Sequence, residues 1–241
     1  MMVPVMDTAL MVHGFAGTSG TWLPVTRLLE PKRYRAVIPD LRGHGQNSAV
    51  RPISFELCVD DLLAAAPPRF TIAGYSLGGR LALQAALKAP ERIERLILIS
   101  TTAGLEDPAL RAQRLESDLL LAERLKRLAI GSFADQWLDG DLFRVDRPEV
   151  NLAARGEILK NRPGDLAAAL SALSVGRMEP MWSRLGELAM PVDVVAGERD
   201  ERYVEIAEQL AGSIGDAVLH VVPAGTHALP RSDPQALAAI L

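Results

Sequence analysis

The stretch from Gly74 to Gly79, Gly-Tyr-Ser-Leu-Gly-Gly, decides the fold that this sequence predicts. The apolar run Phe70–Ala73 before it is typical of a buried strand, and a run of good helix formers follows it to Lys88. A strand, a sharp turn and a helix around Gly-x-Ser-x-Gly describe a nucleophile elbow, which exposes the serine hydroxyl above a sheet. We therefore expect Ser76 to be the reactive residue of an active site.

Apolar runs and helical patterns alternate on both sides of this stretch. Six short apolar runs without polar alternation favour a mostly parallel sheet of about six strands, buried on both faces: Thr8–Val12, Tyr34–Ile38, Phe70–Ala73, Leu96–Ile99, Val192–Ala196 and Val218–Val222. Helices are predicted near Thr21–Leu29, Phe55–Ala65, Leu77–Lys88, Pro108–Leu128, Asp165–Leu173 and Tyr203–Ala211, and from Pro234. The pattern predicts an α/β core of residues 1–102 and 191–241, with a helical lid insertion of residues 103–190.

The composition excludes several other classes of protein. The chain has 241 residues, 49% of them hydrophobic, and a net charge of −4 without a long basic run, so we expect no nucleic-acid partner. No segment resembles a signal peptide or a membrane span, and the single cysteine, Cys58, excludes an internal disulfide. We expect a cytoplasmic protein that acts on a small molecule, as a monomer or small homo-oligomer.

Two residues can complete the chemistry of Ser76. A serine needs an imidazole to take its proton and a carboxylate to orient that imidazole, and in this architecture they follow in the order Ser, acid, His. Asp200 lies just beyond a predicted strand, and His227 just beyond the last one. Asp193 and Glu198 are the alternative acids, and Asp200 is also placed to cap the helix that follows it.

The remaining histidines have structural interpretations. His220 lies within a strand, His44 is in a glycine-rich loop that it can brace, and His13 closes the first strand. The loop after that strand is also expected to carry an oxyanion-hole donor. We expect this hole to consist of the backbone N–H groups of Phe15 and Leu77.

Several motifs together resemble one superfamily. They are His13-Gly-Phe, Pro39-Asp-Leu-Arg-Gly-His-Gly45, the elbow, Gly197-Glu-Arg-Asp200 and Gly225-Thr-His227. On these motifs the chain is identified as a member of the α/β-hydrolase superfamily. Within it, the chain resembles the 2-succinyl-6-hydroxy-2,4-cyclohexadiene-1-carboxylate synthases of menaquinone biosynthesis, through the following segments: Gly74–Arg80, Thr102–Asp107 with Arg111–Arg114, Phe133–Trp137 with Phe143, and His227 with Pro234.

The resemblance implies a pyruvate-eliminating lyase that needs no metal or organic cofactor. In such an enzyme Ser76, made basic by its partners, removes a proton α to the succinyl carbonyl. The resemblance further implies that the substrate contacts are Tyr75, Arg80, Arg114 and Trp137. The residues themselves favour an anionic substrate, because Arg80 stands one helical turn from Ser76 and guanidinium pairs well with carboxylate; the resemblance implies that this substrate is a polycarboxylate. Glu116 or Asp118 could instead pair with Arg111 or Arg114 in surface ion pairs.

Two positions depart from the family pattern. Ile158 stands where an arginine is expected, and Lys160 or Arg162 could take its place. Pro230 stands where many relatives have a second histidine. A carboxylic-ester or lactone hydrolase with Ser76 as covalent nucleophile would use the same three residues, so it is the alternative function; a non-catalytic receptor would not need them.

Overall fold

A six-stranded sheet organises the computed structural model, which describes residues 7–29 and 34–241. Its order is β2-β1-β3-β4-β5-β6, and every neighbouring pair is parallel. The strands are β1 Asp7–Val12, β2 Tyr34–Val37, β3 Phe70–Tyr75, β4 Ile93–Ile99, β5 Val192–Gly197 and β6 Ala217–Val222. The predicted fold class is confirmed, and the strands differ from their predicted bounds only by a few residues at the ends.

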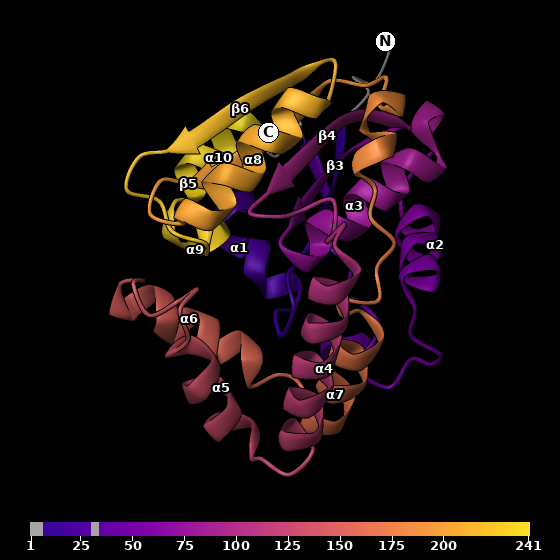
Figure 1. Ribbon diagram of the computed structural model, residues 1–241. Helices are drawn as coiled ribbons and strands as arrows, with labels where there is room; N and C mark the ends of the chain where they lie inside the picture. Colours follow the sequence, from indigo (N-terminus) through magenta and orange to yellow (C-terminus); the bar gives the residue numbers. More distant parts are fainter. Residues whose placement is uncertain (1–6, 30–33) are drawn as a thin grey trace.

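Helices cover both faces of this sheet (Figure 1). One face packs on α2 (Phe55–Ala65), α3 (Leu77–Lys88) and α8 (Glu201–Ser213). The other face packs on α1 (Leu23–Thr26), α9 (Leu229–Ser232) and α10 (Pro234–Ile240). Successive residues of a strand point to opposite faces, so Ile72 belongs to the first apolar cluster and Ala73 to the second.

The helix predicted over Thr21–Leu29 is wrong in extent. The structure has a 3-10 turn, Ser19–Trp22, followed by the one-turn α1. Pro24 lies at the second position of α1. A proline is accepted in the first turn, but further in it removes a backbone donor and clashes with the preceding turn, so a helix from Thr21 cannot run through it.

Between β4 and β5 the described chain forms helices and loops but no strand. The helices are α4 Pro108–Leu125, α5 Ile130–Leu138, α6 Pro148–Ile158, α7 Pro163–Ala172 and a 3-10 turn, Trp182–Glu187. They lie beyond one end of the sheet (Figure 1). Helix α4 packs against α7 and α5 against α6, around an apolar cluster that also includes Ala16 of the core. The division into a core and a lid at 103 and 190 stays a prediction.

The carboxyl ends of the parallel strands face this helical insertion. The loops after β1, β3, β5 and β6 therefore meet at one edge, where ligands bind in open α/β sheets. None of the helices in residues 7–29 and 34–241 is long and apolar enough to cross a membrane.

Candidate active site

Ser76 occupies a strained turn between β3 and α3. Its φ of 54° and ψ of −111° are rare for a residue with a side chain, and the turn is held because Ser76 N–H donates to the Ile99 carbonyl at 2.9 Å. A Cβ on Gly78 would lie 2.2 Å from the Val12 carbonyl oxygen, and one on Gly74 would lie 2.3 Å from the Gly78 oxygen. Only glycine lets the strand and the helix approach this closely, which is the physical basis of the motif.

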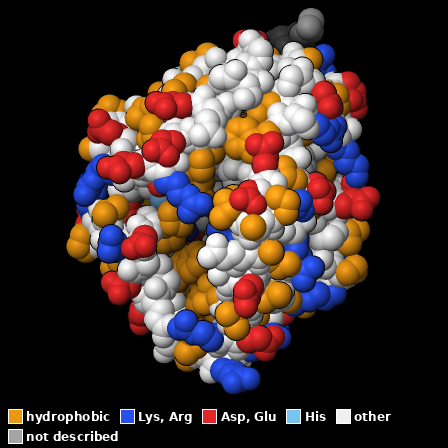
Figure 2. Space-filling model, viewed as in Figure 1, with side chains coloured by type: hydrophobic (Ala, Val, Ile, Leu, Met, Phe, Trp, Pro, Cys, Tyr) orange, Lys and Arg blue, Asp and Glu red, His pale blue; other side chains and the backbone are white. Residues whose placement is uncertain are grey.

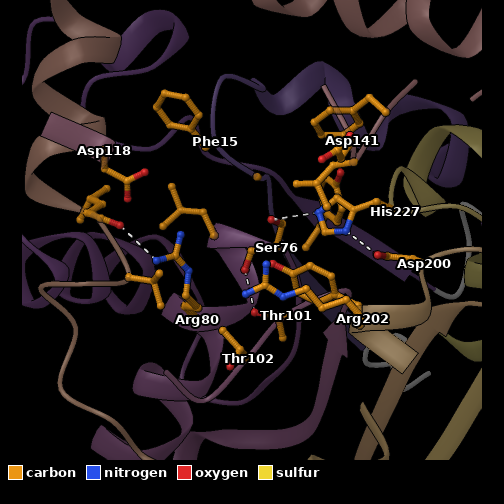
Figure 3. Close-up of a pocket in the computed structure, with 18 of the residues that line it drawn as sticks. Phe15, Ser76, Arg80, Thr101, Thr102, Asp118, Asp141, Asp200, Arg202 and His227 are labelled. Atoms are coloured by element: carbon orange, nitrogen blue, oxygen red, sulfur yellow. Dashed lines mark hydrogen bonds and ion pairs between the residues drawn. The ribbon is translucent and has the colours of Figure 1, made fainter. Parts of the chain in front are cut away.

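The structure brings Ser76, His227 and Asp200 together (Figure 3). His227 Nδ1 lies 2.6 Å from Asp200 Oδ2, and its Nε2 lies 3.3 Å from Ser76 Oγ. The imidazole is 1% exposed and the carboxylate 8%, so water does not compete for their hydrogen bond. Asp200 precedes α8 but makes no capping hydrogen bond with its side chain, so the alternative role as a helix cap is wrong.

Aromatic rings enclose the His227 imidazole. The ring centroids of Tyr75, Tyr203 and Phe143 lie 5.5, 4.6 and 5.7 Å from it. Tyr75 comes from β3, Tyr203 from α8 and Phe143 from the turn after α5, so three separate segments fix the plane of the imidazole. Sequence reasoning missed Tyr203, whose place follows from the packing of α8.

Two of the other histidines, His13 and His44, hold the backbone, whereas His220 pairs with Asp193 at 2.7 Å. The N–H of Leu41 donates to His13 Nε2 at 3.0 Å, and the N–H of Ala16 donates to His44 Nε2 at 3.2 Å. Burial lowers the pKa of both imidazoles, that of His44 to about 3, so both are neutral acceptors at physiological pH. His44 thereby braces the loop that carries Phe15.

The backbone N–H groups of Phe15 and Leu77 are free to bind a ligand. Leu77 is the first residue of α3, where an N–H has no partner within the helix. Neither N–H donates a hydrogen bond to any residue of the described chain. The two residues line the same cavity as Ser76, so the predicted oxyanion hole is compatible with this placement and stays a prediction.

A cavity of about 430 Å³ opens above Ser76. Figure 2 shows it as a hollow with apolar side chains between the core and the insertion. All four predicted contacts, Tyr75, Arg80, Arg114 and Trp137, line it. Its apolar wall also includes Phe15, Leu142, Phe143, Leu170, Leu173 and Val175.

Arg80 is a cation in this cavity with no carboxylate partner among the residues described. It is mostly removed from solvent; its Nη1 donates to the Leu173 carbonyl at 3.1 Å, and its guanidinium carbon lies 5.9 Å from the centre of the Phe55 ring. Burial lowers its pKa to about 10, which leaves it charged at neutral pH. A desolvated cation without a counter-ion is costly, so this side chain favours an anionic ligand.

Arg114 differs because a carboxylate holds it. Its Nε donates to Asp118 Oδ1 at 2.9 Å, and the Ser174 hydroxyl donates to Asp118 Oδ2 at 2.7 Å. Asp118 is 8% exposed and Arg114 is 42% exposed. The pair expected between these residues is present, yet Arg114 still lines the cavity, so the ion pair and the ligand contact are compatible.

The suggestion that Lys160 or Arg162 replaces an arginine at position 158 is wrong. Ile158 is buried in the apolar cluster of the insertion, whereas Lys160 pairs with Glu157 at 2.7 Å and Arg162 is exposed. Neither cation lines the cavity. The further cations that do so are Arg199 and Arg202, which follow β5 and which sequence reasoning did not single out.

The acidic residues of the cavity are mostly engaged. Asp118 pairs with Arg114, Asp200 with His227, and Asp141 with Arg144 at 3.4 Å. Across residues 7–29 and 34–241 no three His, Cys, Asp or Glu side chains gather in a way that could hold a metal ion.

Comparisons with known proteins agree with this geometry. A family model described as the alpha/beta hydrolase fold matches residues 9–230. The 2-succinyl-6-hydroxy-2,4-cyclohexadiene-1-carboxylate synthase of Enterobacter sp. (strain 638) is 30% identical over 242 residues, which cover 99% of this chain and 91% of that protein. The synthase of the same name from Salmonella arizonae is 29% identical, covering 95% and 90%.

Solved structures give a matching result. MenH from S. aureus is similar with a TM-score of 0.90 and 28% identity, covering 97% of this chain and 91% of that structure. A thermophilic esterase from Thermogutta terrifontis, with malate bound, has a TM-score of 0.83 and 26% identity, covering 97% and 87%.

Proposed function

The chain belongs to the alpha/beta hydrolase fold family, and from that premise we propose that it is a pyruvate-eliminating lyase. Its product would be 2-succinyl-6-hydroxy-2,4-cyclohexadiene-1-carboxylate. The synthases that this chain resembles at 28–30% identity are named after that compound. It would act in the cytoplasm on a small polycarboxylate, as a monomer or small homo-oligomer, without nucleic acid, metal or organic cofactor.

The observation that carries this proposal is Arg80. A mostly buried guanidinium one turn from Ser76, with no carboxylate partner among the described residues, calls for an anionic group beside the reacting atoms. The substrate, 2-succinyl-5-enolpyruvyl-6-hydroxy-3-cyclohexene-1-carboxylate, carries such groups. Arg114 on the insertion adds a second cation on the same side, while Tyr75 and Trp137 contribute the apolar walls.

The geometry supports a role for Ser76 as general base. Asp200 holds His227 with Nε2 directed at Ser76 Oγ, so the imidazole can take the hydroxyl proton while Ser76 Oγ takes the proton α to the succinyl carbonyl. The electrons of that C–H bond form an enolate, whose oxygen is placed at the Phe15 and Leu77 N–H groups. As the ring double bond forms, the C–O bond to the enolpyruvyl group breaks, and the released enolate is protonated to pyruvate.

The test is pyruvate release from enzymatically generated substrate by the wild type and by Ser76→Ala. We expect release by the wild type and a loss of at least about 10³-fold in the variant, because the positioned base is absent. Both proteins should have the same melting temperature within a few degrees. A wild type that releases no pyruvate would overturn the proposal.

A carboxylic-ester hydrolase is the second candidate. It is favoured by the apolar wall of the cavity and by the likeness to the Thermogutta terrifontis esterase. Ser76 would then attack an ester carbonyl and form an acyl-enzyme. Ser76-dependent turnover of a p-nitrophenyl ester without pyruvate release would select this candidate, and binding of a ligand without turnover by either assay would select the receptor.

A further inference from the structure

Arg202 is, with Arg199, one of two further cations of the cavity whose side chains have no ion pair or hydrogen bond in the described chain. It belongs to the first turn of α8, two residues after Asp200, and it lines the cavity above Ser76. Its side chain is exposed and makes no ion pair or hydrogen bond with any residue of the described chain. In Figure 3 the Arg80 side chain lies on one side of Ser76, and Arg202 reaches in from the other.

Arg202 makes no ion pair with any acid of the described chain, although acidic residues lie near it. Asp200 is held by His227, and Asp118 is held by Arg114 and Ser174. Glu201 is the adjacent residue on α8, and side chains one apart on a helix do not face each other. Among the described residues, the cavity therefore has a cation without an ion pair on each side of Ser76.

We propose that Arg202 is a specificity-determining residue that binds a second carboxylate of the ligand. Arg80 would hold one anionic group and Arg202 another, so the ligand would pass over Ser76 between them. The inference rests on the proposed function in assigning a polycarboxylate substrate, and it adds that the loop that holds Asp200 also selects the substrate. Guanidinium suits this task because its planar fork meets both oxygens of a carboxylate.

Two small keto acids separate one anionic group from two. The probes are 4-oxopentanoate, which has one carboxylate, and 2-oxoglutarate, in which a second carboxylate replaces the methyl group beside the ketone. The two molecules are otherwise the same. Binding of each would be measured by calorimetry for the wild type, Arg202→Gln and Arg202→Lys. Arg162→Gln is the matched control, because Arg162 is an exposed arginine that lies outside the cavity and whose side chain makes no ion pair or hydrogen bond in the described chain.

We expect the wild type to bind 2-oxoglutarate more tightly than 4-oxopentanoate. Arg202→Gln should weaken 2-oxoglutarate binding by about 10-fold and leave 4-oxopentanoate unchanged, because one charge-assisted pair is lost. Arg202→Lys should weaken 2-oxoglutarate binding less, because lysine keeps the positive charge but lacks the planar fork of guanidinium. Arg162→Gln should bind both ligands as the wild type does.

Two results would overturn the proposal: no preference of the wild type for 2-oxoglutarate, or a preference that Arg202→Gln retains. Neither measurement depends on turnover. A wild type that discriminates between the ligands through Arg202 but releases no pyruvate would support this anion site and overturn the proposed reaction. Pyruvate release without that discrimination would do the reverse.

Discussion

The two walls of the cavity are built in different ways. On the core side, backbone contacts fix Ser76: Gly78 lies against the end of β1, and the Ser76 N–H donates to the Ile99 carbonyl of β4. On the insertion side, side-chain pairs hold the ligand-facing groups, as Asp118 holds Arg114. Backbone packing tolerates almost no substitution, whereas a side-chain pair can be exchanged without loss of the fold. This difference suggests that backbone packing in the core fixes the reacting group, whereas side chains of the cavity, Arg80 and Arg202 from the core and Arg114 from the insertion, set the substrate.

The largest effect should come from Gly78→Ala in the core. Its Cβ would lie within 2.7 Å of two backbone carbonyl oxygens, those of Val12 and His13, and neither can move without shifting β1. We expect a loss of about 3 kcal/mol in the free energy of unfolding, measured by denaturant titration.

The matched control lies in the insertion. Gly156→Ala lies inside α6, and no atom lies within 4 Å of the added Cβ, so the variant should gain about 0.5–1 kcal/mol from helix propensity. Equal losses in the two variants would contradict the contrast between the walls.

A smaller effect is expected from Asp118→Asn in the insertion. The amide keeps the shape but not the charge that holds Arg114, so the KM for the cyclohexene substrate should rise by about 3- to 10-fold with little change in kcat. The control is Glu179→Gln, the 86%-exposed partner of Arg111, which should change neither constant because surface ion pairs contribute little. A fall in kcat without a change in KM would refute a positioning role.

The smallest effect is a pH dependence of the free energy of unfolding. It is expected where the insertion packs against the core. Asp146 is buried close to Thr226 and His227, and burial raises the pKa of its carboxyl above the ordinary value. The folded state therefore binds this proton more tightly than the unfolded state, and stability is lost as the pH rises from the ordinary aspartate pKa through the raised one. Asp146→Asn should therefore become more stable relative to the wild type as the pH rises from 4 to 7, because the amide has no proton to lose.

That gain would be measured by denaturant titration at both pH values. A pH-independent difference for Asp146→Asn would show that its carboxyl does not carry this dependence.

A similar contrast explains which parts of the fold and of the candidate site can be predicted from the sequence. The elbow, the six strands and the positions of Asp200 and His227 follow from local patterns, because a strand and the loop after it are contiguous in the chain. Arg202 and Tyr203 reach the cavity only through the packing of α8, which no local pattern records. The prediction that Lys160 replaces the arginine expected at position 158 is wrong for a related reason. Ile158 lies on the buried side of α6, and Lys160, two residues later, faces solvent.

The most direct test of the account is the rate of pyruvate release by Arg80→Gln, because the unpartnered Arg80 carries the assignment. The control is Arg177→Gln, an exposed arginine outside the cavity whose guanidinium donates to the Ser171 carbonyl. We expect kcat/KM to fall by about 10- to 100-fold in Arg80→Gln, since a charge-assisted contact is lost, and to stay at the wild-type value in the control. Wild-type rates of pyruvate release by a folded Arg80→Gln would contradict it.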